Sequence, residues 1–235
     1  MALESVADAS APQFSEGGFF EYHIYDLQRP TTIKNNQTKQ ISLLEAAGVK
    51  TEKEMMVYGQ HHYFMGGYQG QELKDPVNVY IKFQNEKENN LGMPLPAGVM
   101  RLYKKDAQES LQFIGEDRIE HTPKDEKIKL KIGKAFDVVA ERKQLHFQAE
   151  RAGGDYVYES EWEISLRNHK EEDVVVTLIE PMSYANWQVI KSTHPHTKED
   201  AFSARFEVSV PPDEEVKLIY RIEMSTSKSR LSRRR

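Results

Sequence analysis

The sequence predicts an all-β protein: a β-sandwich of two packed sandwich-like halves, with an immunoglobulin-like C-terminal part. Three observations support this prediction. From Phe19 onward apolar and polar residues alternate with a period of two, which is the pattern of strands with one buried face. Strand-like segments recur about every 8–14 residues between turn signals, as in sandwiches and barrels. The segment 40–56, which most resembles a helix, carries Gly48 at its centre.

That segment, QISLLEAAGVKTEKEMM, is better explained by strands. Leu44, Ala47 and Gly48 would share one face of a helix. However, a central glycine costs a helix about 1 kcal/mol relative to alanine, and Val49 favours a strand. We therefore expect two strands around Gly48.

The other segments with strand periodicity follow in chain order. In the first half the alternating apolar positions are Val77, Val79, Ile81 and Phe83, then Met100 and Leu102, then Ile128, Leu130 and Ile132. Residues 156–166 place Tyr156, Tyr158, Trp162, Ile164 and Leu166 on one face. Residues 174–179 are apolar on both faces, which is typical of a central strand.

The last two strands are predicted to form a hairpin. Residues 202–210 and 216–224 both alternate strictly, and Pro211, Pro212 and Asp213 separate them. Proline cannot donate to a strand ladder, so the chain must turn there. Taken together, the pattern divides the chain into a flexible leader (1–16), an N-terminal sandwich half (17–131), an immunoglobulin-like sandwich (132–225) and a basic flexible tail (226–235).

Composition excludes several classes of function. The 235 residues include no cysteine, so disulfides, thiolate zinc sites and a thiol nucleophile are ruled out. The net charge is −5, and charges of both signs alternate along the strands, which disfavours nucleic-acid binding. No apolar run reaches the length of a membrane span, and residues 1–16 lack the features of a signal peptide.

Several segments carry a resemblance to a known family. They are YDLQRPTTIKNNQTKQISLLEAAGV (25–49), LPAGVMRLYKKD (95–106), FIGEDRIEHTPKDEKIKLKIGKAFDV (113–138), EISLRNHKEEDVVVTLIEPM (163–182) and VPPDEEVKLIYRIE (210–223). In this order they resemble the C-terminal β domain of a bacterial family of unknown function that includes mucoidy inhibitor A-like proteins. The resemblance implies a β-sandwich module and a periplasmic or cell-envelope location. It supplies no catalytic residue.

The segment from Tyr58 to Gly70 has the most unusual composition, because aromatic residues and histidines alternate with glycines. Tyrosine provides rigid amphipathic contact area, so the segment is a candidate recognition surface for a protein or a sugar. The alternative is a strand with Tyr63 and Phe64 partly in the core, followed by a glycine-rich turn. If the segment is extended, two neighbouring histidines point to opposite faces and chelate poorly. The candidate binding residues are Tyr58, His61, His62, Tyr63, Phe64 and Tyr68.

Two further groups of residues are candidates for chemistry. His194 and His196 could reach one metal ion from an extended segment, but a third ligand, such as Glu199 or Asp200, would be needed. The carboxylates Glu116, Asp117 and Asp137 are predicted to be structural, because short carboxylates at strand ends accept backbone N–H bonds. Arg118 is expected to pair with one of them.

The sequence therefore favours a non-catalytic binding module of an exported or cell-envelope protein, with no cofactor and with a protein or an envelope glycan as partner. One alternative is carbohydrate binding through residues 58–68. The other is a metal-assisted hydrolase that uses His194 and His196. No residue is assigned a catalytic role, and no feature of the sequence selects an oligomeric state.

Overall fold

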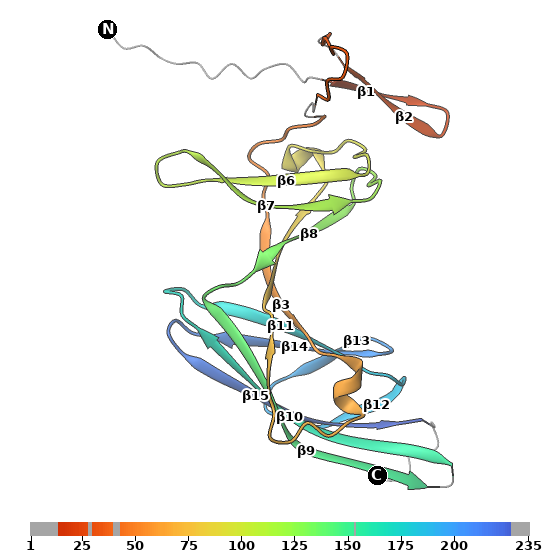
Figure 1. Ribbon diagram of the computed structural model, residues 1–235, viewed down its shortest axis with the longest axis vertical. Helices are drawn as coiled ribbons and strands as arrows, with labels where there is room; N and C mark the ends of the chain where they lie inside the picture. The colour runs from red at the N-terminus through yellow and green to blue at the C-terminus, as the bar shows by residue number, and fades with distance from the viewer. Residues whose placement is uncertain (1–13, 28–29, 40–42, 153, 227–235) are drawn as a thin grey trace. The chain divides into compact units, whose positions relative to one another are not determined.

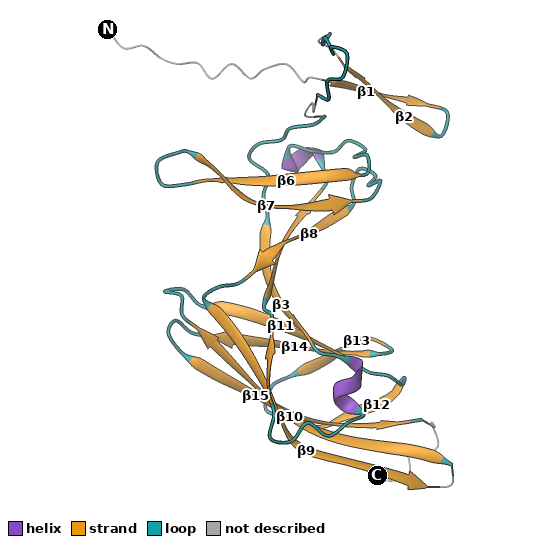
Figure 2. Ribbon diagram, in the orientation of Figure 1, coloured by secondary structure: helices purple, strands orange, loops and turns teal. Residues whose placement is uncertain are grey.

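The computed structural model describes residues 14–27, 30–39, 43–152 and 154–226. The described chain is all-β, as predicted (Figure 2). Two short 3₁₀-helices, η1 (His61–Phe64) and η2 (Lys87–Asn89), are the helical segments of this part of the chain, and neither is long and apolar enough to cross a membrane.

The described residues form two compact units. The first unit lies within Met1–Lys50, Phe83–Gly98 and Ile119–Ile128, and the second within Thr51–Lys82, Val99–Arg118 and Lys129–Arg235. Residues on both sides of position 132 therefore share the second unit. The halves 17–131 and 132–225 remain a prediction. Of the predicted leader and tail, residues 1–13 and 227–235 lie outside the described residues, and residues 14–16 already belong to a strand.

The strands of the described residues form four sheets, and Figure 1 labels most of these strands. Two of the sheets are two-stranded: β1 (Phe14–Phe19) with β2 (Tyr22–Leu27), and β6 (Gly98–Lys105) with β7 (Leu111–Ile119). The five-stranded sheet has the order β12 (Asn186–Ser192), β15 (Glu215–Ser225), β10 (Asp155–Asn168), β9 (Val138–Ala152) and β4 (Glu72–Asp75). The six-stranded sheet has the order β13 (His196–Asp200), β14 (Ser203–Val210), β11 (Val174–Pro181), β3 (Glu52–Tyr58), β5 (Asn78–Gln84) and β8 (Lys127–Lys134).

The five- and six-stranded sheets share one hydrophobic core, in the manner of a β-sandwich. Trp162, Ile164 and Leu166 face it from β10, while Val176 and Leu178 face it from β11. These are the positions that the period of two predicts. Full burial of one such side chain contributes about 1.5–3 kcal/mol, so alternation along these strands is the main reason that the two sheets pack together. The strand β11 lies inside its sheet, between β14 and β3, as its apolar character on both faces predicts.

The predicted hairpin between the last two strands is wrong, although both strands exist. β14 pairs with β11 in the six-stranded sheet, whereas β15 pairs with β10 in the five-stranded sheet. The Pro211–Glu214 connection therefore carries the chain from one sheet to the other. Both strands bury one apolar face in the same core, and alternation alone cannot distinguish two strands that pair from two strands that face each other across a core.

Of the two strands predicted around Gly48 within 40–56, the described residues contain the one that follows the glycine, and residues 40–42 lie outside the described residues. Residues 43–51 form no strand, and β3 begins at Glu52. Gly48 has a φ of +68°, a conformation that suits glycine and that interrupts an extended strand. β3 pairs in parallel with β11 and antiparallel with β5, so it lies inside the six-stranded sheet.

Candidate interaction surface

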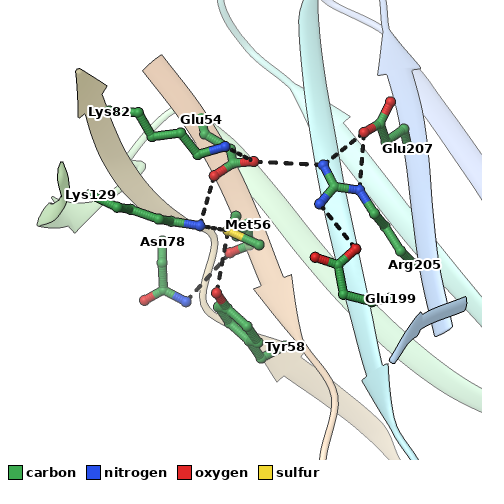
Figure 3. Close-up of polar contacts among 9 residues, drawn as sticks. All are labelled: Glu54, Met56, Tyr58, Asn78, Lys82, Lys129, Glu199, Arg205 and Glu207. Carbon is green, nitrogen blue, oxygen red and sulfur yellow. Dashed lines mark hydrogen bonds and ion pairs between the residues drawn. The ribbon is translucent and has the colours of Figure 1, made fainter. Parts of the chain in front are cut away.

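The outward-facing side chains of the six-stranded sheet form a dense polar cluster (Figure 3). On β3 the residues Met55 and Val57 point into the core, so the alternate residues Glu54, Met56 and Tyr58 project from the opposite face. Neighbouring strands contribute the other members. We call this cluster the outer face, and it consists of Glu54, Met56, Tyr58, Asn78, Tyr80, Lys82, Lys129, Val175, Thr177, Glu199, Arg205 and Glu207.

The carboxylate of Glu54 is the centre of the outer face. Its side chain is 12% exposed, and three cations surround it. Lys82 Nζ lies 2.8 Å from Oε1, Lys129 Nζ lies 2.7 Å from Oε2, and Arg205 Nη2 lies 3.7 Å from Oε1. Burial raises the pKa of Glu54, but the hydrogen bonds and charges of the two lysines outweigh it, so the pKa lies below its ordinary value. Glu54 is therefore an anion at neutral pH.

Arg205 is held between three carboxylates. Its Nη2 donates to Glu207 Oε1 at 2.8 Å, and its Nη1 lies 3.5 Å from Glu199 Oε2. The hydrogen bond to Glu207 and the nearby acidic groups raise the pKa of the guanidinium, against the opposing effect of its partial burial. These contacts fix a planar donor group in one orientation on the surface.

Tyr58 and Tyr80 add an aromatic border to the charged residues. The Tyr58 hydroxyl donates to Met56 Sδ at 3.3 Å. Burial, a hydrogen bond with Tyr80 and the negative charge of Glu54 and Glu199 raise the pKa of Tyr58 to about 12, so this phenol stays neutral. The Lys129 ammonium lies 4.4 Å from the centroid of the Tyr80 ring, a cation–π contact.

The outer face is hollowed only slightly. A depression of about 200 Å³ is lined by Glu52, Lys53, Glu54, Lys82, Val175, Thr177, Arg205 and Glu207. Pockets for small ligands usually measure about 300–1,000 Å³ and are mostly apolar. Glu54, Lys82, Arg205 and Glu207 in this depression already pair with one another. The pKa values of Glu54 and Tyr58 lie far from neutrality. The arrangement is therefore better suited to contact with a broad surface than to acid–base chemistry.

The predicted recognition segment is split between surface and core. Tyr58 belongs to the outer face, and His61 and His62 are exposed. Residues 61–64 form η1, so the strand of the alternative interpretation is not present at these four residues. Phe64 is buried, and the rings of Tyr63 and Tyr68 lie 5.4 Å and 6.0 Å from that of Trp162. The glycines between these aromatic residues suggested an exposed loop. In the structure Tyr63, Phe64 and Tyr68 pack in or against the core.

Of the two histidines proposed for metal binding, His196 begins the exposed edge strand β13 and His194 lies in the bend before it. His194 Nδ1 lies 2.9 Å from the Thr193 hydroxyl, and the His196 ring packs 5.8 Å from that of Phe206. Across the described ranges, no three histidine, aspartate or glutamate side chains are grouped so that they could hold a metal ion.

The carboxylates predicted to be structural make the expected kind of contact at one position. Asp117 accepts backbone N–H bonds from Arg118 and Lys131, each at 2.8 Å. Glu116 pairs with Arg101, and it is the backbone N–H of Arg118 that contacts one of the three carboxylates, that of Asp117. The backbone carbonyl of Asp137 accepts a hydrogen bond from the backbone N–H of His169.

Sequence reasoning missed a buried ionic cluster between the two sheets. Arg142 on β9 is fully buried, and its Nε lies 2.7 Å from Asp75 Oδ2 on β4. Its Nη2 lies 2.7 Å from Glu180 Oε1 on β11, and its Nη1 donates to the Tyr220 hydroxyl at 3.0 Å. A signal for the cluster exists in the sequence. Val138, Ala140 and Arg142 alternate in register, so the arginine falls on the core face of a strand.

Comparison of the chain with models of protein families, with curated proteins and with solved structures gives no match.

Proposed function

We propose that this protein is a non-catalytic β-sandwich binding module that contacts a protein partner through the outer face of its six-stranded sheet. The observation that carries the proposal is the fixed orientation of the Arg205 side chain on this face. Its guanidinium is held in place by Glu199 and Glu207, and Val175, which is 55% exposed, lines the same shallow depression. Oriented arginines and aromatic residues beside apolar area are frequent energetic centres of protein interfaces.

The proposal also includes the expectations from the sequence about the immunoglobulin-like arrangement, the location and the family. We infer an immunoglobulin-like arrangement for the C-terminal strands, and the support for it is that β10, β11, β14 and β15 form antiparallel pairs in two facing sheets. The parallel pairing of β3 with β11 departs from that arrangement. A bacterial origin, a periplasmic or cell-envelope location and membership of the family that includes mucoidy inhibitor A-like proteins rest on the residues that carry the resemblance.

Site-specific photocrosslinking tests the proposed surface. A photoreactive amino acid is placed at Val175 on the outer face and, as a matched control, at Lys143, which is exposed on β9 of the other sheet. Each protein is expressed in its native host and irradiated. We expect a discrete heterotypic adduct from position 175 that is absent from position 143 and is lost when Arg205→Ala is added. Equal adducts from both positions, or none from position 175, would contradict the proposal.

A further inference from the structure

Residues Gly59–Gln71 cross from the six-stranded sheet to the five-stranded sheet, and we call this segment the strap. It leaves the end of β3, contains η1 and reaches β4 at the edge of the five-stranded sheet. Between these two strands it belongs to no ladder. Its turns are closed by local bonds, such as the one from Tyr63 N to the Gln60 carbonyl at 3.0 Å. The strap therefore has a backbone that can move without breaking a sheet.

One buried side chain holds the middle of the strap. Gln144 projects from β9 and is 2% exposed. Its Oε1 accepts a hydrogen bond from the Tyr68 backbone N–H, and its Nε2 donates to the Gly66 carbonyl at 2.9 Å and to the Ser160 hydroxyl at 3.1 Å. At its first residue the strap is held by the bond from Gly59 N to the Ile179 carbonyl, 2.9 Å long. A single amide thus makes much of the polar attachment.

Aromatic rings, together with a hydrogen bond from the Ser183 hydroxyl to the His61 carbonyl at 3.4 Å, provide further attachment. Phe64 is buried, and Tyr63 and Tyr68 pack on Trp162 while Arg142 lies 4.9 Å from the centroid of the Tyr63 ring. Trp162 itself is fully buried. This burial has a cost, because the Trp162 indole N–H is buried without a hydrogen-bond partner among the described residues. An unpaired buried donor opposes the closed arrangement, and any state that lets water reach it removes that cost.

We propose that the strap is a latch that opens as a unit while both sheets stay folded, and that its opening uncovers an aromatic surface centred on Trp162. Opening breaks the Gln144 bonds to the strap backbone and gives the indole N–H an acceptor. The sheets are untouched, because their ladders and the buried Arg142–Glu180 pair lie outside the strap.

Hydrogen exchange of the indole N–H measures this opening directly. Protection factors are obtained by NMR for the Trp162 indole, for the Trp187 indole, which donates to the Ala201 carbonyl at 2.9 Å, and for the backbone amide of Leu166 in β10. We expect the Trp162 indole to be at least ~10-fold less protected than the Leu166 amide. We also expect its exchange to depend less on urea than that of the amide, since opening of the strap exposes less surface than unfolding of both sheets.

Two matched variants separate the latch from general destabilisation. Gln144→Ala removes the amide that grips the strap, and Gln148→Ala removes an exposed amide of the same strand that bonds to Glu150. The first variant is expected to speed exchange of the Trp162 indole by about 10-fold or more relative to the Leu166 amide, and the second to leave it unchanged.

The proposal is overturned if the wild-type Trp162 indole exchanges with the same protection and the same urea dependence as the Leu166 amide, because exchange would then require global unfolding. It is equally overturned if Gln144→Ala speeds both protons by the same factor. Should that variant fail to fold, the urea series on the wild-type protein decides the question alone.

Discussion

Replacement of Arg142 by methionine should destabilise the sandwich more than any single change to its surface ion pairs. The substitution keeps an apolar chain of similar length and removes the charge. The carboxylates of Asp75 and Glu180, with side chains 5% and 0% exposed, then lose their cation inside the core. Leaving one member of a buried ion pair without its partner typically costs about 3–5 kcal/mol, so we expect a loss near 4 kcal/mol at pH 7.

The loss of stability caused by Arg142→Met should depend on pH, and the pKa of Glu180 determines the direction. Burial raises the pKa of Glu180 above its ordinary value, although Arg142 opposes the rise. A raised pKa means that the folded protein binds the proton more tightly than the unfolded chain. The associated stability is fully present below the unfolded pKa, and it is lost as the pH rises through the folded value. Removal of Arg142 raises the pKa of Glu180 further, so the destabilisation should shrink as the pH is lowered from 8 to 5.

The assay is urea unfolding followed by tryptophan fluorescence, because both tryptophans, Trp162 and Trp187, lie in the second compact unit. The matched control is Arg167→Met in the same sheet, where the partly exposed Arg167 pairs with Glu141 at 2.8 Å. An exposed pair of this kind is worth about 1 kcal/mol or less. A loss for Arg142→Met below about 1 kcal/mol, or one that grows on acidification, would refute the reasoning.

Three other substitutions test separate contacts. The pKa of Glu54 is lowered in the folded protein, so its contribution to stability is present above its ordinary pKa and disappears as the pH falls through the folded value. Glu54→Gln should therefore cost about 1 kcal/mol of stability at pH 7 and nothing near pH 2, as urea titrations at both pH values will show. Gly59→Ala would drive its Cβ into the carboxylate of Glu180, so it should cost about 1–3 kcal/mol and lower the melting temperature measured by circular dichroism. Asn85 is buried in the first compact unit and donates to the carbonyls of Met93 and Pro123 at 2.8 Å each, so Asn85→Ala should cost about 2 kcal/mol and speed amide exchange in residues 119–128.

Each of these three has a result that would contradict it. A Glu54→Gln variant that is equally destabilised at pH 2 and pH 7 would show that size, and not charge, matters at that position. An unchanged melting temperature for Gly59→Ala would mean that Glu180 can move aside. Exchange that stays slow in residues 119–128 after Asn85→Ala would remove the asparagine as an organiser of the first unit.

The sequence by itself determined the class of the fold and the faces of its principal strands. Trp162, Ile164 and Leu166 alternate with polar residues, and burial of that face is a local property that a period of two records. The central position of β11 was readable for the same reason, since its residues are apolar on both sides. The role of Asp117 followed from the short carboxylate itself, which suits backbone N–H groups at strand ends.

Only the tertiary structure decided which strands pair and which side chains meet. β14 and β15 carry the same alternation whether they form a hairpin or face each other across the core, and the structure places them in different sheets. Asp75, Arg142 and Glu180 come from three strands far apart in the chain, so no local pattern predicts that one guanidinium joins two carboxylates. The aromatic residues of the strap were visible as a composition, but their burial depends on Trp162 and Gln144, which lie about 80–100 positions further along the sequence. Alternation reports what a strand buries, and the partner that covers it is a property of the folded chain.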